Sequence, residues 1–153
     1  MDLTIKLNVP DPPPREIVTA IAALIDRIGP GATIERDTEW TVERAVQLLR
    51  DINLRTTLLI EAAVEGGGFA DGPAFREKNG ENALRGPSQS ITKAIKRGAE
   101  QGLWSADIAH PLTPTTPDKG SWSKTGGYYL DKDLVPVFRA AIDDMRSKGV
   151  LGP

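Results

Sequence analysis

Apolar side chains occupy every second position from Leu3 to Val9, with polar residues between them. A period of two is typical of a strand with one buried face, so this segment is predicted to be a strand. The proline-rich segment at residues 10–14 is expected to end it, because proline cannot donate a backbone hydrogen bond.

The spacing becomes helical after Arg15. Apolar residues recur there at intervals of three and four, and "GPG" at residues 29–31 ends the predicted helix; these positions are Ile17, Ile21, Leu24, Ile25 and Ile28. A single strand and helix bury little surface, and an unpaired strand edge can pair with another chain. Residues 1–35 are therefore expected to form an N-terminal strand-helix extension, which docks on the rest of the chain or forms a homodimer through this strand and helix.

Residues 36–153 are predicted to form the main domain, beginning with two helices that Thr41 and Asn53 can cap. The second helix is apolar over most of its circumference, which is typical of a central core helix, and three glycines follow it. Further helices are predicted over residues 73–79, 88–101 and 134–145.

Two strands are predicted in the C-terminal half of the chain. Leu103 and Trp104 are expected to begin one strand, and residues 126–131 to form its return partner, with a polar loop at residues 105–125 between them. The predicted fold class is therefore α+β and mainly helical.

The composition narrows the functional classes. The chain has 153 residues, of which 39% are hydrophobic and 26% are charged, as in a soluble globular domain. No apolar run approaches the roughly 20 residues of a membrane span, and the N-terminus does not resemble a signal peptide, so a cytoplasmic protein without a membrane partner is expected. With no cysteine and a single histidine, we expect no metal, no cofactor and no catalytic activity.

Positive charge is concentrated on the helix predicted at residues 88–101, although the net charge of the chain is -2. At about 100° per residue, its apolar and small residues share one side, and the opposite arc carries Gln89, Lys93, Lys96 and Arg97, with Thr92 at the margin. No acidic residue lies between Asn82 and Ala99, where Arg85 adds a fourth positive charge. Such an arc can contact phosphates and base edges of DNA; an ordinary solvated face is the alternative.

The order of these elements resembles the winged helix-turn-helix family of bacterial DNA-binding regulators, including actinobacterial winged-helix proteins. The resemblance covers residues 41–147, and the residues matching the family's recognition helix are Ser90, Ile91, Lys93, Ile95, Gly102 and Leu103. It implies a non-catalytic transcriptional regulator that binds double-stranded DNA. The implied base contacts come from Ser88, Gln89, Ser90, Thr92 and Lys93, the backbone contacts from Arg85, Lys96 and Arg97, and the wing contacts from Lys119 and Lys124. Ser88 or Ser90 is also expected to cap the helix or donate to a phosphate.

Two features depart from the family pattern. Gly98 stands where a large aliphatic side chain is usual, so Trp104 or Phe75 is expected to fill the gap. The loop at residues 105–125 is long and rich in proline, and it can serve either as a DNA-contacting wing or as a protein contact.

Other functions stay open on the sequence alone. A winged-helix module that binds protein without DNA, through the long loop and the N-terminal strand, is the second hypothesis, and a small-molecule sensor is a third. His110 has no nucleophile or metal partner in the pattern, so we expect it to be simply exposed. Trp40 and Trp104 are expected in the core, whereas Trp122 is a candidate for base stacking.

Overall fold

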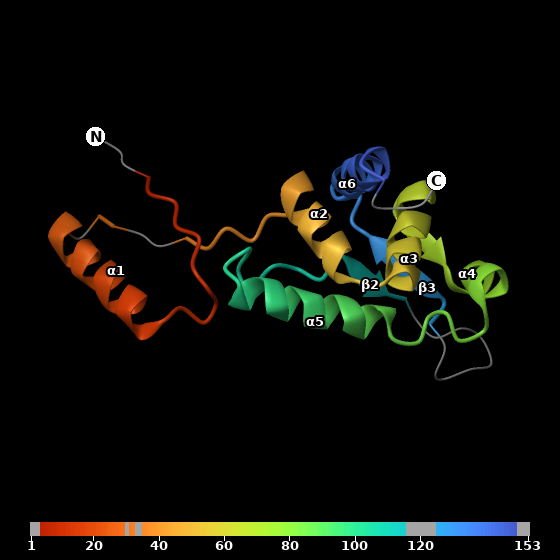
Figure 1. Ribbon diagram of the computed structural model, residues 1–153, viewed down its shortest axis with the longest axis horizontal. Helices are drawn as coiled ribbons and strands as arrows, with labels where there is room; N and C mark the ends of the chain where they lie inside the picture. Colours follow the sequence, from red (N-terminus) through yellow and green to blue (C-terminus); the bar gives the residue numbers. More distant parts are fainter. Residues whose placement is uncertain (1–3, 30, 33–34, 116–124, 150–153) are drawn as a thin grey trace.

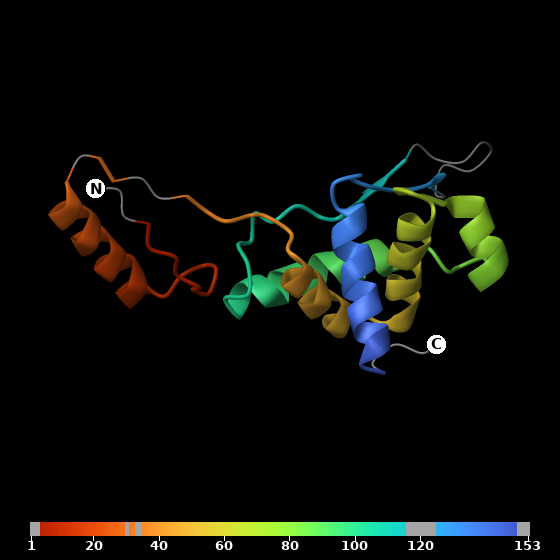
Figure 2. The ribbon, with the colours of Figure 1, turned by 90° about the horizontal axis from the view of Figure 1, so that it is seen from above.

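The computed structural model describes residues 4–29, 31–32, 35–115 and 125–149. These residues form six helices and one three-stranded antiparallel sheet, and about 53% of them are helical. The predicted α+β class is therefore confirmed. Figures 1 and 2 show two regions, which we call the arm (described residues from 4 to 35) and the body (described residues from 36 to 149).

The arm contains one helix, and the body contains the other five and the sheet. In chain order the elements are α1 (Arg15–Ile28), α2 (Val42–Asp51), α3 (Leu54–Glu65), β1 (Phe69–Asp71), α4 (Gly72–Asn79), α5 (Pro87–Glu100), β2 (Leu112–Pro114), β3 (Gly127–Leu130) and α6 (Val135–Ser147). Within the described part of the chain, none of these helices has the length and apolar character needed to cross a membrane.

The first two helices of the body begin at the predicted caps. The Thr41 hydroxyl accepts a hydrogen bond from the Arg44 backbone N–H at 3.1 Å, and the Asn53 side chain accepts one from the Thr56 N–H at 2.9 Å. α6 also begins as its sequence allows, because Pro136 lies in the first turn, where no intrahelical hydrogen bond is lost.

α3 is the central helix of the body, as its apolar circumference predicts. Leu59, Ile60 and Ala63 are completely buried, and α3 packs against α5, α6 and the sheet. The two predicted core tryptophans are also buried: Trp40 lies 5.7 Å from Trp104 and 5.5 Å from Phe138 between ring centroids. One continuous core therefore holds the five helices of the body together.

The sheet has the strand order β1-β3-β2, with Ala70 opposite Tyr128 and Leu112 opposite Leu130. β3 confirms the strand predicted at residues 126–131. β1 was not predicted, because three residues are too few to show a period of two. Burial raises the pKa of the Tyr128 phenol above its ordinary value, so this side chain stays neutral inside the core.

The strand predicted at Leu103–Trp104 is wrong. These residues lie in the turn after α5, and β2 begins eight residues after Trp104, at Leu112. The indole N–H of Trp104 donates to the Ile95 carbonyl at 2.8 Å, so the ring is held against α5. The large apolar side chain of Trp104 therefore makes a core contact, and the backbone of this residue belongs to no strand.

The predicted N-terminal strand is also wrong. Residues 4–10 have no regular secondary structure, and Ile5 and Leu7 are more than half exposed. An alternating pattern forms a strand only where another segment pairs with its backbone, and no described segment does so here. The helix predicted after Arg15 is confirmed as α1.

Both ends of the arm are attached near the C-terminal end of α5. The Asp11 N–H donates to the Ala99 carbonyl at 2.7 Å, and the Asp11 carboxylate accepts from the Ala106 N–H at 2.8 Å. Where the chain returns to the body, the Arg36 guanidinium pairs with the Asp107 carboxylate at 2.9 Å. These contacts fix the base of the arm, while α1 stands apart from the body in both views (Figures 1 and 2).

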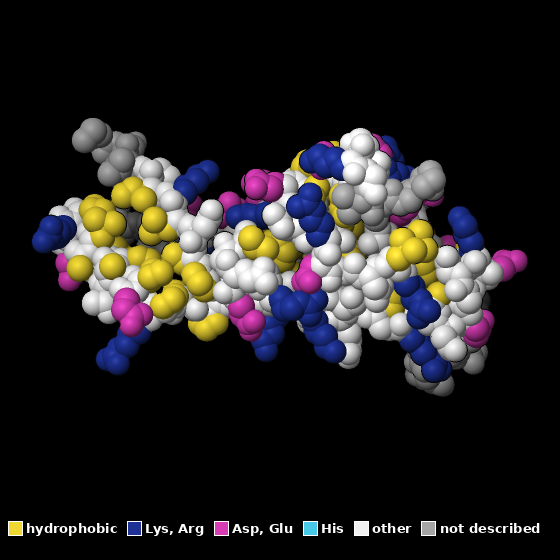
Figure 3. Space-filling model, in the orientation of Figure 1, with side chains coloured by type: hydrophobic (Ala, Val, Ile, Leu, Met, Phe, Trp, Pro, Cys, Tyr) yellow, Lys and Arg dark blue, Asp and Glu magenta, His cyan; other side chains and the backbone are white. Residues whose placement is uncertain are grey.

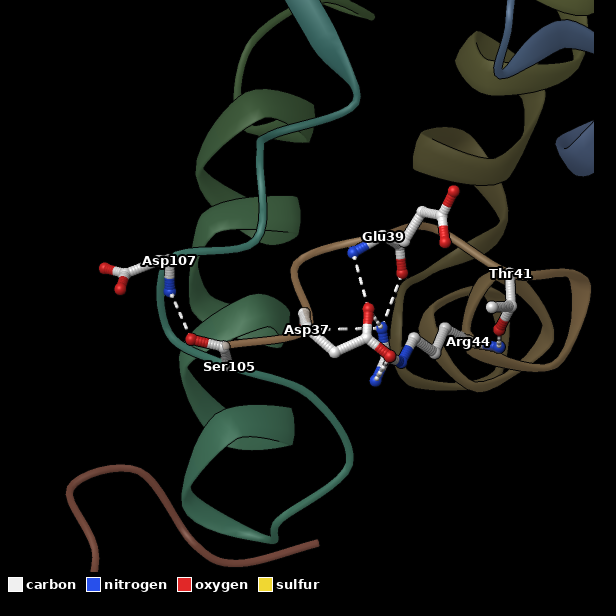
Figure 4. Close-up of polar contacts among 6 residues, drawn as sticks. All are labelled: Asp37, Glu39, Thr41, Arg44, Ser105 and Asp107. Atoms are coloured by element: carbon white, nitrogen blue, oxygen red, sulfur yellow. Dashed lines mark hydrogen bonds and ion pairs between the residues drawn. The ribbon is translucent and has the colours of Figure 1, made fainter. Parts of the chain in front are cut away.

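A second polar cluster fixes the segment between Arg36 and α2 (Figure 4). The Asp37 carboxylate accepts from the Glu39 N–H at 3.1 Å and pairs with Arg44 at 3.2 Å, and Arg44 also donates to the Glu39 carbonyl at 2.6 Å. The Glu39 N–H and the Arg44 guanidinium lower the pKa of Asp37 below its ordinary value. In the same figure, the Ser105 hydroxyl accepts from the Asp107 N–H at 3.2 Å.

Candidate nucleic-acid interface

α5 begins at a sharp turn made by Gly86 and Pro87. Gly86 has a φ of 95°, which glycine adopts without a steric penalty, and Pro87 occupies the first turn, where its missing N–H costs no hydrogen bond. No side chain caps the helix, so the capping role predicted for Ser88 or Ser90 is wrong. Both serines lie inside the helix because Pro87 already provides its start.

One side of α5 is buried in the body, as its wheel predicts; the buried residues are Pro87, Ile91, Ala94, Ile95, Gly98 and Ala99. A Cβ atom added at Gly98 would overlap the six-membered ring of Trp104. The expectation that an aromatic ring fills the gap is therefore confirmed, and the residue is Trp104. This contact fixes which side of α5 faces outward.

The outward side of α5 is polar and basic. Gln89, Thr92, Lys93, Lys96 and Arg97 are exposed, and the helix contains no acidic residue before Glu100. Lys and Arg side chains project along α5 at the lower edge of the view in Figure 3. Arg85, in the turn before the helix, is exposed as well. We call Arg85, Lys93, Lys96 and Arg97 the basic arc.

One residue of the basic arc forms an ion pair with a described residue, and the other three do not. The Arg97 guanidinium lies 2.9 Å from the Asp51 carboxylate at the end of α2. Arg85, Lys93 and Lys96 form no ion pair with any residue that the structure describes. Both members of the Arg97–Asp51 pair are more than 40% exposed, so the pair is solvent-screened and Arg97 can still reach a ligand.

The five residues that the family resemblance implies as base contacts differ in their solvent exposure and in their hydrogen bonds. Gln89 and Lys93 are exposed, whereas Ser88 and Ser90 are half-buried. The Thr92 hydroxyl donates to the Ser88 carbonyl at 3.0 Å, so its remaining acceptor capacity and its methyl group are available to a ligand. Gln89 and Lys93 are therefore the best placed of the five.

His110 is not simply exposed, contrary to the prediction. It is half-buried, its Nδ1 accepts from the Leu112 N–H at 3.1 Å, and its Nε2 lies 3.1 Å from the Ser88 carbonyl. Because Nδ1 acts as an acceptor, Nε2 carries the proton and donates to Ser88. The ring thus joins the first turn of α5 to the start of β2, a structural role that the sequence did not indicate.

The predicted wing residues Lys119 and Lys124 and the base-stacking candidate Trp122 lie outside the described residues. Directly after those residues in the chain, Thr125 is held by the body: its carbonyl accepts from the guanidinium of buried Arg76 on α4 at 3.1 Å. Arg76 therefore fixes the start of β3 relative to α4. The sequence did not indicate this role, because Arg76 is a single arginine in a polar helix.

Arg50 is a further cation beside α5 that the sequence did not indicate. It is exposed on α2 and lines a shallow hollow of about 230 Å³, which Gly98, Gln101 and the Arg97 partner Asp51 also line. It comes close to α5 only through folding, because α2 and α5 pack against each other.

The described residues contain no group of three or more His, Asp or Glu side chains placed to hold a metal ion. Comparisons of the chain with protein-family models, curated proteins and solved structures gave no match. A functional proposal must therefore depend on the chemistry of the basic arc.

Proposed function

We propose that the chain is a non-catalytic DNA-binding protein, a transcriptional regulator with a winged helix-turn-helix fold, that places α5 in the major groove of duplex DNA. The observation that carries the proposal is the outward side of α5, where Lys93 and Lys96 are exposed and form no ion pair among the described residues. Cations in this state are available to phosphates.

The architecture supports this proposal. α4 and α5 are consecutive helices joined by residues 80–86, and the antiparallel pair β2–β3 follows α5, as a wing would. α5 has 14 residues and is therefore about 21 Å long, and the major groove admits a helix of this kind. Gln89 and Lys93 would then face base edges, and Lys96, Arg97 and Arg85 would face phosphates.

The test is a salt titration of duplex binding by fluorescence anisotropy, with the full chain and mixed genomic fragments. The double variant Lys93→Glu/Lys96→Glu should lower the affinity at least about tenfold at low salt. It should also reduce the slope of log affinity against log salt by about 1, because the phosphate contact of Lys96 is lost.

A matched control carries the same change in charge away from α5. Lys132→Glu/Lys148→Glu alters exposed lysines before and after α6, and it should lower the affinity far less. The proposal fails if the wild-type chain binds no duplex at low salt, or if the control variant loses as much affinity as the α5 variant.

One observation favours the alternative, a module that binds protein without DNA. The Arg97–Asp51 pair neutralises part of the basic arc, and the chain as a whole is acidic. A protein partner that is retained by the Lys93→Glu/Lys96→Glu variant and is not displaced by DNA would support this alternative.

A further inference from the structure

Arg50 is an exposed arginine in the last turn of α2, and it forms no ion pair with any residue that the structure describes. It lines the hollow between α2 and α5, together with Gln47 on its own helix and with Gly98 and Gln101 on α5. The two helices pack against each other, so the end of α2 is fixed beside the last turns of α5 (Figure 1). Arg50 therefore adds a positive charge at one side of the helix that carries the basic arc.

The outward surface of α5 has two sides. At about 100° per residue, Gln89 and Lys93 mark the middle of this surface. Lys96 and Arg97 lie on opposite sides of that middle line. Asp51 of α2 pairs with Arg97 at 2.9 Å, so the Arg97 side is the one beside α2, and Lys96 lies on the other side.

The charges on the two sides become equal only when Arg50 is included. Lys96 forms no ion pair with a described residue, so its side carries one positive charge. On the α2 side, the Asp51 carboxylate offsets the charge of Arg97, and Arg50 supplies the positive charge that is left. Glu100, the acidic residue of α5, lies between the two sides and favours neither.

The major groove of B-form DNA is about 12 Å wide, and a helix with its side chains is about 10–12 Å across. A helix in the groove therefore has the phosphates of one strand on each side of it. We propose that Arg50 contacts the phosphate backbone of the strand on the α2 side, while Lys96 contacts that of the other strand. This inference rests on the proposed DNA binding, and it extends the contact with the duplex from α5 to α2.

The side chains around the hollow suit a phosphate group. The guanidinium of an arginine presents several N–H donors in one plane, and two of them can bind two phosphate oxygens at once. The side-chain amides of Gln47 and Gln101 can each donate a further hydrogen bond from the walls of the hollow. The Asp51 carboxylate would repel a phosphate, but Arg97 offsets its charge.

A salt titration of duplex binding tests this contact, with the full chain and labelled genomic fragments. Arg50→Ala should lower the affinity about 3- to 10-fold at low salt and reduce the slope of log affinity against log salt by about 1, because one phosphate contact is lost. Arg50→Lys should keep the slope within about 0.3 of the wild-type value, because the charge remains.

Lys132→Ala is the matched control, since it removes one positive charge from an exposed lysine before α6. It should leave the slope within about 0.3 of the wild-type value. Trp104 lines the same hollow as Arg50, so its emission shows whether a substitution at position 50 disturbs the fold.

A tethered cleavage reagent tests where the DNA lies. The chain has no cysteine, so Gln47→Cys creates a single attachment point for an iron–EDTA group in the hollow. With peroxide and ascorbate, the iron produces hydroxyl radicals that cut the nearest sugar–phosphate backbone. The bound fragments should be cut several-fold more than by the same group attached at Lys132→Cys.

The outcomes separate this inference from the proposed function. If the wild-type chain binds no duplex at low salt, both fail. The contact of Arg50 alone is overturned if Lys93→Glu/Lys96→Glu loses affinity while Arg50→Ala keeps the wild-type slope. It is also overturned if the iron attached at position 47 cuts no more than the iron attached at position 132.

Discussion

α1 and α5 are helices of the same length with the same kind of sequence, an apolar side and a polar side, but their environments are opposite. The apolar side of α5 is buried against α2 and α3, with Ile91 and Ala94 completely inaccessible. The apolar side of α1 buries none of its residues. An amphipathic pattern therefore predicts a helix, but it does not say which surface covers the helix. In α5 the body covers the apolar side and leaves the polar side exposed, whereas in α1 the apolar side is only half-buried or exposed.

The strongest test of this contrast is the same substitution in both helices. Ile91→Ala should destabilise the body by about 2–5 kcal/mol, because it leaves a cavity beside α2 and α3. Ile28→Ala, at a residue that is 55% exposed, should change the free energy of unfolding by no more than about 0.5 kcal/mol. Urea unfolding followed by tryptophan emission measures both. Equal losses in the two variants would mean that α1 belongs to the core of the body.

A smaller effect is expected from separating Arg97 from Asp51. Asp51→Asn should alter stability by less than about 1 kcal/mol, since the pair is exposed. It should raise duplex affinity several-fold, because it removes a negative charge beside α5 and releases Arg97. Anisotropy at low salt measures the change. Asp143→Asn on α6 is the control, and an equal rise in that variant would show that net charge alone is responsible.

The smallest effect is expected at the junction of the arm and the body. The folded-state pKa of Asp37 is lower than its ordinary value of 3.8, so its contribution to stability is present above that value and is lost as the pH falls through the folded pKa. A carboxyl-carbon NMR titration should therefore give a midpoint below 3.8. Arg44→Leu should move the midpoint upward, and only in part, because the Glu39 N–H still donates to the carboxylate. A wild-type midpoint at or above the ordinary value would contradict this interpretation of Figure 4.

Features that depend on neighbouring residues were predicted well from the sequence. The caps at Thr41 and Asn53, the position of α1 and the outward side of α5 each follow from residues within a few positions of one another. The buried role of Trp104 was also predicted, because Gly98 leaves a gap that a large ring must fill.

Features that depend on distant residues were not predicted. Arg97 meets Asp51 across 46 positions of the chain, and His110 meets Ser88 across 22, so no local pattern indicates either contact. The strand expected at the N-terminus failed for the same reason, because alternation describes one segment and says nothing about a partner. The strand through which the homodimer was predicted to form is therefore absent from residues 4–10.

The contact between Gly98 and the indole of Trp104 has a consequence for engineering. Any residue larger than glycine at position 98 requires a residue smaller than tryptophan at position 104. Gln89, Lys93 and Lys96 point away from this contact, so they carry no such restriction. Residues on the outer surface of α5 can therefore be substituted while the core beneath the helix stays unchanged.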